Sequence, residues 1–104
     1  MGLKKDFLWG SATASYQCEG AVNEGGRVPS MWDTYLHDGG YETGDVASDF
    51  YHHYKEDIKM MAEGGQNTLR LSLAWPRIIK NIKGEINEEG VEFYRDVLKT
   101  CQQY

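Results

Sequence analysis

The stretch that decides the fold is Arg70-Leu-Ser-Leu-Ala-Trp-Pro-Arg77, an apolar, strand-like run that begins with a charged side chain. Side chains alternate between the two faces of a strand. One face suits packing against helices, and its residues are Leu69, Leu71 and Leu73. The opposite face consists of Arg70, Ser72 and Ala74. Burial of an arginine costs free energy unless an anion meets it, so Arg70 predicts a carboxylate or phosphate partner.

Strands and helices are expected to alternate around this stretch. Large and small residues alternate over residues 7–14, which predicts a short buried strand, and the Gly-rich residues 20–47 predict a long loop. Apolar residues three and four apart predict a helix that begins at Ser48-Asp49 and ends at Gly64-Gly65. A second strand is expected over residues 67–74, a loop over 76–83 and a second helix from Asn87 onward. The inner face of this last helix is predicted to be Val91, Tyr94, Val97, Leu98 and Cys101.

The resulting βαβα order is typical of a parallel sheet with right-handed crossovers. Two strands alone leave unpaired sheet edges and exposed apolar faces. The apolar pattern of the last helix also continues to the end of the sequence at Tyr104. We therefore expect a piece of a longer protein that folds poorly or aggregates by itself. In a closed (β/α)₈ barrel, the face with Arg70 is the lumen, and active sites lie at the carboxyl ends of the strands. Gln17 and Trp75 would fall at that end.

Composition narrows the classes of partner. The net charge is −5 and no basic run occurs, which argues against nucleic acid as a partner. The apolar runs are only a few residues long and the first residues lack the apolar core of a secretory signal, so neither a membrane nor secretion is expected. Cys18 and Cys101 stand far apart, as is typical of free thiols in a reducing compartment. We therefore expect a cytoplasmic protein.

Five blocks in collinear order resemble glycoside hydrolase family 1, the family of β-glucosidases and 6-phospho-β-glycosidases. The blocks are Phe7-Leu-Trp-Gly with Ala12-Thr-Ala and Tyr16-Gln-Cys-Glu-Gly20; Ser30-Met-Trp-Asp33; Ala47-Ser-Asp-Phe-Tyr-His52 with Tyr54-Lys-Glu-Asp-Ile58; Arg70-Leu-Ser-Leu-Ala-Trp-Pro-Arg-Ile78; and Asn87-Glu-Glu-Gly90 with Phe93-Tyr94. The resemblance implies an α/β fold, namely the amino-terminal quarter, about two βα units, of a (β/α)₈ TIM barrel. Residues 1–104 would be an incomplete piece of a single catalytic domain. No cofactor and no metal are implied.

The resemblance also implies roles for individual residues. Gln17 matches a residue that binds the sugar, since a carboxamide offers a donor and an acceptor to adjacent hydroxyls; a loop-capping amide is the alternative. Arg70 matches the arginine that hydrogen-bonds the catalytic nucleophile and keeps it ionised; a structural ion pair is the alternative. Trp32 either lines the pocket entrance or packs in a core. Glu19 is implied to be structural. The adjacent pair His52 and His53 face different ways on a helix and make a poor metal site.

No catalytic residue is expected within this chain. A retaining glycosidase uses an acid/base and a nucleophilic carboxylate about 5 Å apart. In the family these glutamates come from Asn-Glu-Pro and Glu-Asn-Gly segments, neither of which occurs here, so both are expected beyond residue 104.

The implied function is hydrolysis of O-glycosyl bonds by a retaining β-glycosidase, of which these residues alone would be inactive. A cytoplasmic setting favours a 6-phospho-β-glucosidase, because phosphorylated β-glucosides arise inside the cell during uptake; a plain β-glucosidase is the alternative. Two hypotheses from other classes are a non-catalytic, self-associating sugar-binding module and an enzyme that uses a pair of its own sixteen acidic residues.

Overall fold

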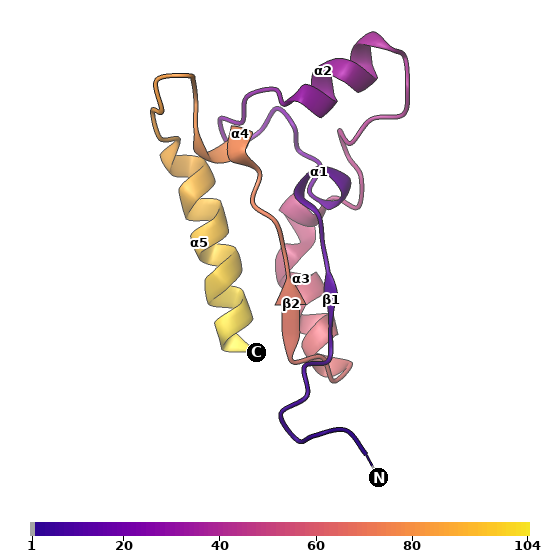
Figure 1. Ribbon diagram of the computed structural model, residues 1–104. Helices are drawn as coiled ribbons and strands as arrows, with labels where there is room; N and C mark the ends of the chain where they lie inside the picture. The colour runs from indigo at the N-terminus through magenta and orange to yellow at the C-terminus, as the bar shows by residue number, and fades with distance from the viewer. Residues whose placement is uncertain (1) are drawn as a thin grey trace.

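A computed structural model describes residues 2–104 and shows strands and helices in alternation (Figure 1). The two strands lie side by side, and their carboxyl ends both lead into short helices. The elements in chain order are β1 (Gly10–Ala12), α1 (Ser15–Cys18), α2 (Met31–Asp38), α3 (Phe50–Glu63), β2 (Thr68–Arg70), α4 (Trp75–Ile78) and α5 (Glu88–Gln103).

The predicted parallel pairing is confirmed, but the strands are shorter than expected. Gly10 pairs with Thr68 and Ala12 with Arg70 in a parallel ladder of three residues per strand. Before the ladder, the Asn67 amide donates to the Trp9 carbonyl at 2.8 Å, and the Asn67 side chain accepts a hydrogen bond from the Trp9 amide at 2.8 Å. The prediction that the first strand is buried is wrong for this chain, because all three residues of β1 are exposed.

The two long helices were predicted correctly. Helix α3 ends at Gly64, and Gly65 follows with φ +90°, a left-handed conformation that glycine adopts without steric cost. Asp49 is the residue before α3, but its carboxylate does not cap the helix amides. It contacts His52 instead, at 2.6 Å between Oδ1 and Nδ1. Similarly, Asn87 precedes α5 without capping it through its side chain.

Three shorter helices were not predicted. Helix α2 lies within the expected loop 20–47 and begins with a capping box, in which the Ser30 hydroxyl accepts from the Asp33 amide and the Asp33 carboxylate accepts from the Ser30 amide. Helix α4 lies where a loop was expected, with Pro76 in its first turn, a position where the missing N–H of proline costs nothing. Helix α1 is a single turn.

The core lies between α3, α5 and the residues that follow β2. Its buried members are Phe50, Ile58, Ala74, Phe93, Tyr94 and Val97. Leu69 and Leu71 pack against this cluster, as predicted for their strand face, but Leu73 is 50% exposed and breaks the pattern.

The predicted inner face of α5 requires one correction. Val97 and Tyr94 are buried as expected, whereas Leu98 is 52% exposed and Phe93 takes a core position instead. The face is therefore rotated toward α4. Gly90 permits that close approach, because a Cβ at this position would lie 1.8 Å from the carbonyl oxygen of Arg77.

None of the helices found in residues 2–104 combines the length and the apolar character needed to cross a membrane.

Candidate active site

The residues predicted for the site lie at the carboxyl ends of the two parallel strands. Gln17 is in α1, directly after β1, and Trp75 begins α4, soon after β2. Arg70 is the last residue of β2. Helix α2, which contains Trp32, lies at this same end of the molecule (Figure 1). The side chains of Gln17, Arg70 and Trp32 are all exposed.

Backbone hydrogen bonds fix α1 relative to the end of β2. The Thr13 amide donates to the Arg70 carbonyl at 2.8 Å, which extends the ladder one residue beyond β1. Two residues later, the Ser15 amide donates to the Ser72 hydroxyl at 2.8 Å. The first amides of a helix have no partner within the helix. Ser72 therefore satisfies the start of α1 and ties the turn that contains Gln17 to the second strand.

Arg70 contacts no carboxylate within salt-bridge distance anywhere in residues 2–104, so its proposed anionic partner stays a prediction. The requirement that a buried arginine meet an anion applies here to Arg77. This side chain is 0% exposed, and its Nε donates to Glu19 Oε1 at 3.1 Å. Its two terminal nitrogens donate to the carbonyls of Glu24 at 3.1 Å and Gly20 at 3.2 Å.

Glu19 is the centre of a buried polar network that joins the segments after both strands. Its residue is only 4% exposed, and its second carboxylate oxygen accepts from the Tyr94 hydroxyl at 2.5 Å. That hydroxyl in turn accepts from the Ala74 amide at 2.7 Å. Burial raises the pKa of Glu19, while the bonds from Tyr94 and Arg77 oppose this rise. The implied structural role of Glu19 agrees with these contacts; sequence reasoning missed its partners.

The guanidinium of Arg77 also lies against aromatic rings. Its central carbon is 4.4 Å from the centroid of the Tyr51 ring and 5.6 Å from that of Phe93. These cation–π contacts favour a charged group in a site with little water. Arg77 therefore joins α4 to α1, α3 and α5 at once, through an ion pair, carbonyl contacts and stacking.

Within residues 2–104, Trp32 does not pack in a core, and both of its roles stay predictions. The residue is 51% exposed and touches the ring of Tyr35 edge-on, with centroids 6.3 Å apart. Helix α2 is held at its start by a buried ion pair between Arg27 and Asp33 at 2.8 Å. The indole of Trp32 is thus presented on an anchored helix at the same end as Gln17.

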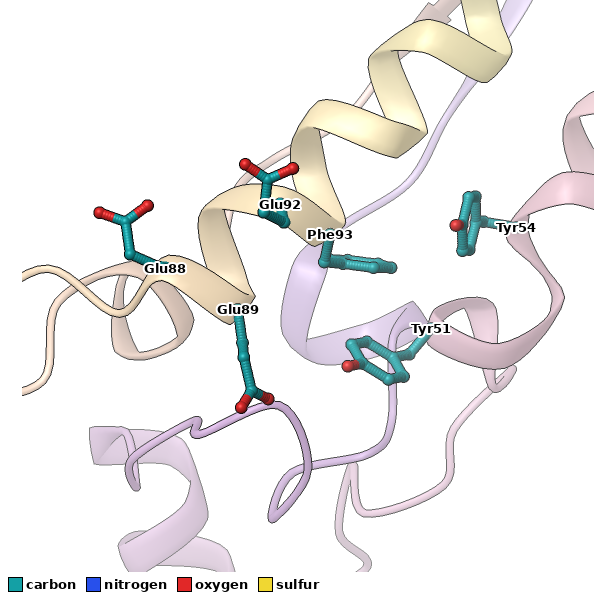
Figure 2. Close-up of a pocket in the computed structure, with 6 residues that line it drawn as sticks. All are labelled: Tyr51, Tyr54, Glu88, Glu89, Glu92 and Phe93. Carbon is teal, nitrogen blue, oxygen red and sulfur yellow. The ribbon is translucent and has the colours of Figure 1, made fainter.

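A separate, open hollow of about 610 Å³ lies on the seam between α3 and α5. Figure 2 shows the side chains that line it. The rings of Tyr51, Tyr54 and Phe93 form its apolar wall, and three glutamates of α5 surround it: Glu88, Glu89 and Glu92. Their carboxylates do not converge, since Glu89 points away from the other two. The hollow therefore gives no support to the hypothesis of an internal catalytic acid pair, which requires two facing carboxylates.

The histidines of α3 make surface ion pairs. His52 contacts Asp49 on one side and Glu24 on the other, at 2.6 and 2.9 Å, and His53 contacts Asp49 at 3.3 Å. His52 thus links α3 to the segment after α1. No group of three or more potential metal-ligating side chains is arranged for a metal ion within residues 2–104.

Comparison with known proteins places this arrangement in a family. The model of "Glycosyl hydrolase family 1" matches residues 1–104. The chain belongs to glycosyl hydrolase family 1. It is 52% identical over 97 residues to a 6-phospho-β-galactosidase of Clostridium acetobutylicum, covering 93% of this chain and 20% of that protein.

Solved structures of family 1 enzymes superpose closely on the chain. A β-glucosidase from Exiguobacterium marinum has a TM-score of 0.91 and 50% identity, with 99% of this chain and 24% of the other covered. A rice β-glucosidase variant in a covalent complex with glucose has a TM-score of 0.91 and 39% identity, with 96% and 22% covered.

Membership of the family establishes the fold class of this chain but not the reaction of the whole protein. The expected fold is confirmed, because the two βα units described here match about a quarter of the barrel enzymes of family 1. The chain spans about a fifth of the length of the curated relatives that it matches. The activity of the whole protein is therefore a matter of proposal.

Proposed function

We propose that the whole protein is a retaining β-glycosidase that hydrolyses O-glycosyl bonds, and that residues 1–104 are an incomplete piece of its single catalytic domain. The observation that carries the proposal is the placement of Gln17 and Arg70 at the carboxyl ends of neighbouring parallel strands in a family 1 chain. In barrel enzymes, this end of the sheet is where substrates bind and react.

Each residue has a chemical role in this proposal. The carboxamide of Gln17 is exposed and offers a donor and an acceptor side by side, which suits two adjacent hydroxyls of a sugar ring. The exposed guanidinium of Arg70 supports the nucleophile by favouring its ionised form. Trp32 contributes an apolar face at the pocket entrance, against which sugar C–H groups can pack.

The chemistry itself requires two carboxylates supplied from outside these residues. A retaining mechanism passes through a covalent glycosyl-enzyme, formed by one carboxylate about 5 Å from the acid/base. The covalent complex with glucose formed by the rice relative supports this course of reaction. The 104-residue piece, which lacks both segments expected to contribute glutamates, is proposed to be inactive alone.

For the substrate, we propose 6-phospho-β-glucosides, with plain β-glucosides as the second candidate. The relative from Clostridium acetobutylicum acts on a phosphorylated glycoside by its name, and a cytoplasmic location would give access to such substrates. The similarity to β-glucosidases is nearly the same, at 50% identity for the protein from Exiguobacterium marinum. The choice is therefore decided by assay.

The test uses the product of the whole gene and, in parallel, the 104-residue polypeptide. Nitrophenyl β-glucoside and its 6-phosphate are offered to each. Hydrolysis by the whole protein alone, with higher kcat/KM for the phosphorylated substrate, is expected. Higher kcat/KM for the plain glucoside selects the second candidate, and absence of hydrolysis of both by a folded whole protein refutes the proposed glucoside substrates.

A self-associating module is favoured by one observation, the exposure of large apolar side chains near the short sheet. Leu8 is 68% exposed, Trp9 54% and Trp75 68%. Such surface drives association when nothing covers it. Sedimentation of the 104-residue polypeptide tests this candidate: a discrete, folded oligomer that binds sugar supports it, and a soluble monomer or an unstructured aggregate contradicts it.

A further inference from the structure

We propose that Glu19 is a positioning residue for Gln17, held by Arg77 and Tyr94 so that the turn containing Gln17 is fixed at both ends. The inference rests on the proposed sugar-binding role of Gln17 and adds a function to the buried network beneath it. Gln17 itself is exposed and makes no hydrogen bond through its side chain within residues 2–104, so its orientation depends on the backbone of α1.

The start of α1 is fixed by Ser72. The Ser72 hydroxyl accepts from the Ser15 amide at 2.8 Å, and α1 has no side-chain cap of its own. Because Ser72 lies two residues after Arg70, this bond sets the distance between the start of α1 and the end of β2. The bond therefore fixes the position of the turn relative to β2, the strand that contains Arg70, the proposed nucleophile-supporting residue.

The end of α1 is fixed by Glu19. Its amide donates to the Ser15 carbonyl at 3.0 Å and its carbonyl accepts from the Tyr51 amide at 3.0 Å. Its carboxylate is held from two directions, by Arg77 from α4 and by Tyr94 from α5. Since Gln17 lies between Ser15 and Glu19, the backbone that orients its carboxamide cannot turn without breaking one of these contacts.

A purely stabilising role does not account well for this network. Removing two charges from water costs several kcal/mol, and replacement of a buried ion pair by apolar residues of similar size is often neutral or stabilising. What charged, hydrogen-bonded groups add is a defined orientation. The network joins the segments that follow both strands, where a small displacement would move Gln17 relative to the sugar.

The test is a double-mutant cycle in the whole protein, with Gln17→Ala, Glu19→Gln and the double variant. Glu19→Gln keeps the size of the side chain but removes its charge, and we expect it to lower kcat/KM about tenfold through misplacement. In the Gln17→Ala background, the same substitution is expected to change kcat/KM less than about twofold, because the group that it positions is absent. Equal effects in both backgrounds would overturn the positioning role.

Two further variants separate positioning from folding. Ser72→Ala releases the other end of α1 without leaving a buried charge, and its effect on kcat/KM is expected to vanish in the Gln17→Ala background as well. Asp96→Asn is the matched control: it weakens the Tyr54 and Lys55 contacts at the seam of α3 and α5, away from the strand ends. It is expected to lower Tm while leaving kcat/KM within about twofold of the parent value.

The cycle also distinguishes the failure of this inference from that of the proposed function. If Gln17→Ala alone leaves kcat/KM unchanged, Gln17 does not bind the reacting sugar, and the proposed role and the positioning inference fall together. If Gln17→Ala lowers kcat/KM and Glu19→Gln multiplies that loss, only the positioning inference falls.

Discussion

Replacement of Arg77 by methionine is predicted to destabilise the protein far more than loss of a surface cation. The guanidinium is 0% exposed and its Nε lies 3.1 Å from Glu19 Oε1. Methionine has a similar length, so the apolar contacts of the side chain are largely retained. What changes is that Glu19 becomes a buried carboxylate without a cation, a change that costs about 3–5 kcal/mol.

The double variant Glu19→Gln with Arg77→Met isolates the charge. A neutral amide at position 19 removes the uncompensated charge, whereas the carbonyls of Glu24 and Gly20, whose donor is Arg77, stay without it in the single and the double variant alike. An unsatisfied buried polar group costs about 1–3 kcal/mol. We therefore expect the double variant to be more stable than the single Arg77→Met variant by about 1–2 kcal/mol.

The assay is chemical denaturation of the whole protein, with the transition that includes these residues followed by near-ultraviolet circular dichroism. Lys59→Met is the matched control, because Lys59 lies 4.0 Å from Glu63 in an exposed pair and its loss should change the free energy of unfolding by less than about 0.5 kcal/mol. The electrostatic explanation is refuted if Arg77→Met matches this control, or if the double variant is no more stable than the single one.

Three further predictions concern packing and charge elsewhere. Gly90→Ala would normally favour a helix by about 1 kcal/mol, but its Cβ would meet the Arg77 carbonyl at 1.8 Å, so we expect a lower Tm, and an unchanged or higher Tm contradicts the close packing. Val97→Ala truncates a fully buried side chain and should lower the free energy of unfolding, measured with denaturant, by about 2 kcal/mol. Leu98→Ala, at a half-exposed position, should lower it much less. The hydrogen bond to Asp45 raises the pKa of His37 above 6.5, so its stabilising contribution is present below that pH and is lost as pH rises through the raised value. An NMR titration should show this pKa, and Asp45→Asn should bring it back toward 6.5; an unchanged pKa would contradict the contact.

The structural features that could be predicted for this chain are those set by residues close together in the sequence. The apolar stripe with Ile58 and the stop at Gly64-Gly65 located α3, and the alternation of elements predicted the parallel pairing. The single turns α1 and α4 are too short for any periodicity to show. Helix α2 had a readable signal, since Ser30 and Asp33 have the spacing of a capping box, but the Gly-rich surroundings favoured a loop.

The buried ion pair shows why the rest could not be predicted. The desolvation cost of an arginine applied equally to Arg70 and Arg77, and nothing in the local sequence decides which of them is buried. The partner of Arg77 is Glu19, 58 residues away in the chain, and their contact exists only because the parallel pairing brings the two strand exits together. The positions of Gln17 and Arg70 could be predicted, because the direction of the parallel strands alone places both residues at the carboxyl end of the sheet.

The most direct test of the account is to determine which anomer of the sugar the whole protein releases from nitrophenyl β-glucoside and from its 6-phosphate. Proton NMR records the anomer before mutarotation proceeds. A retaining β-glycosidase is predicted to release the β-anomer first, with the α-anomer appearing later. Initial release of the α-anomer by the folded protein would contradict the account.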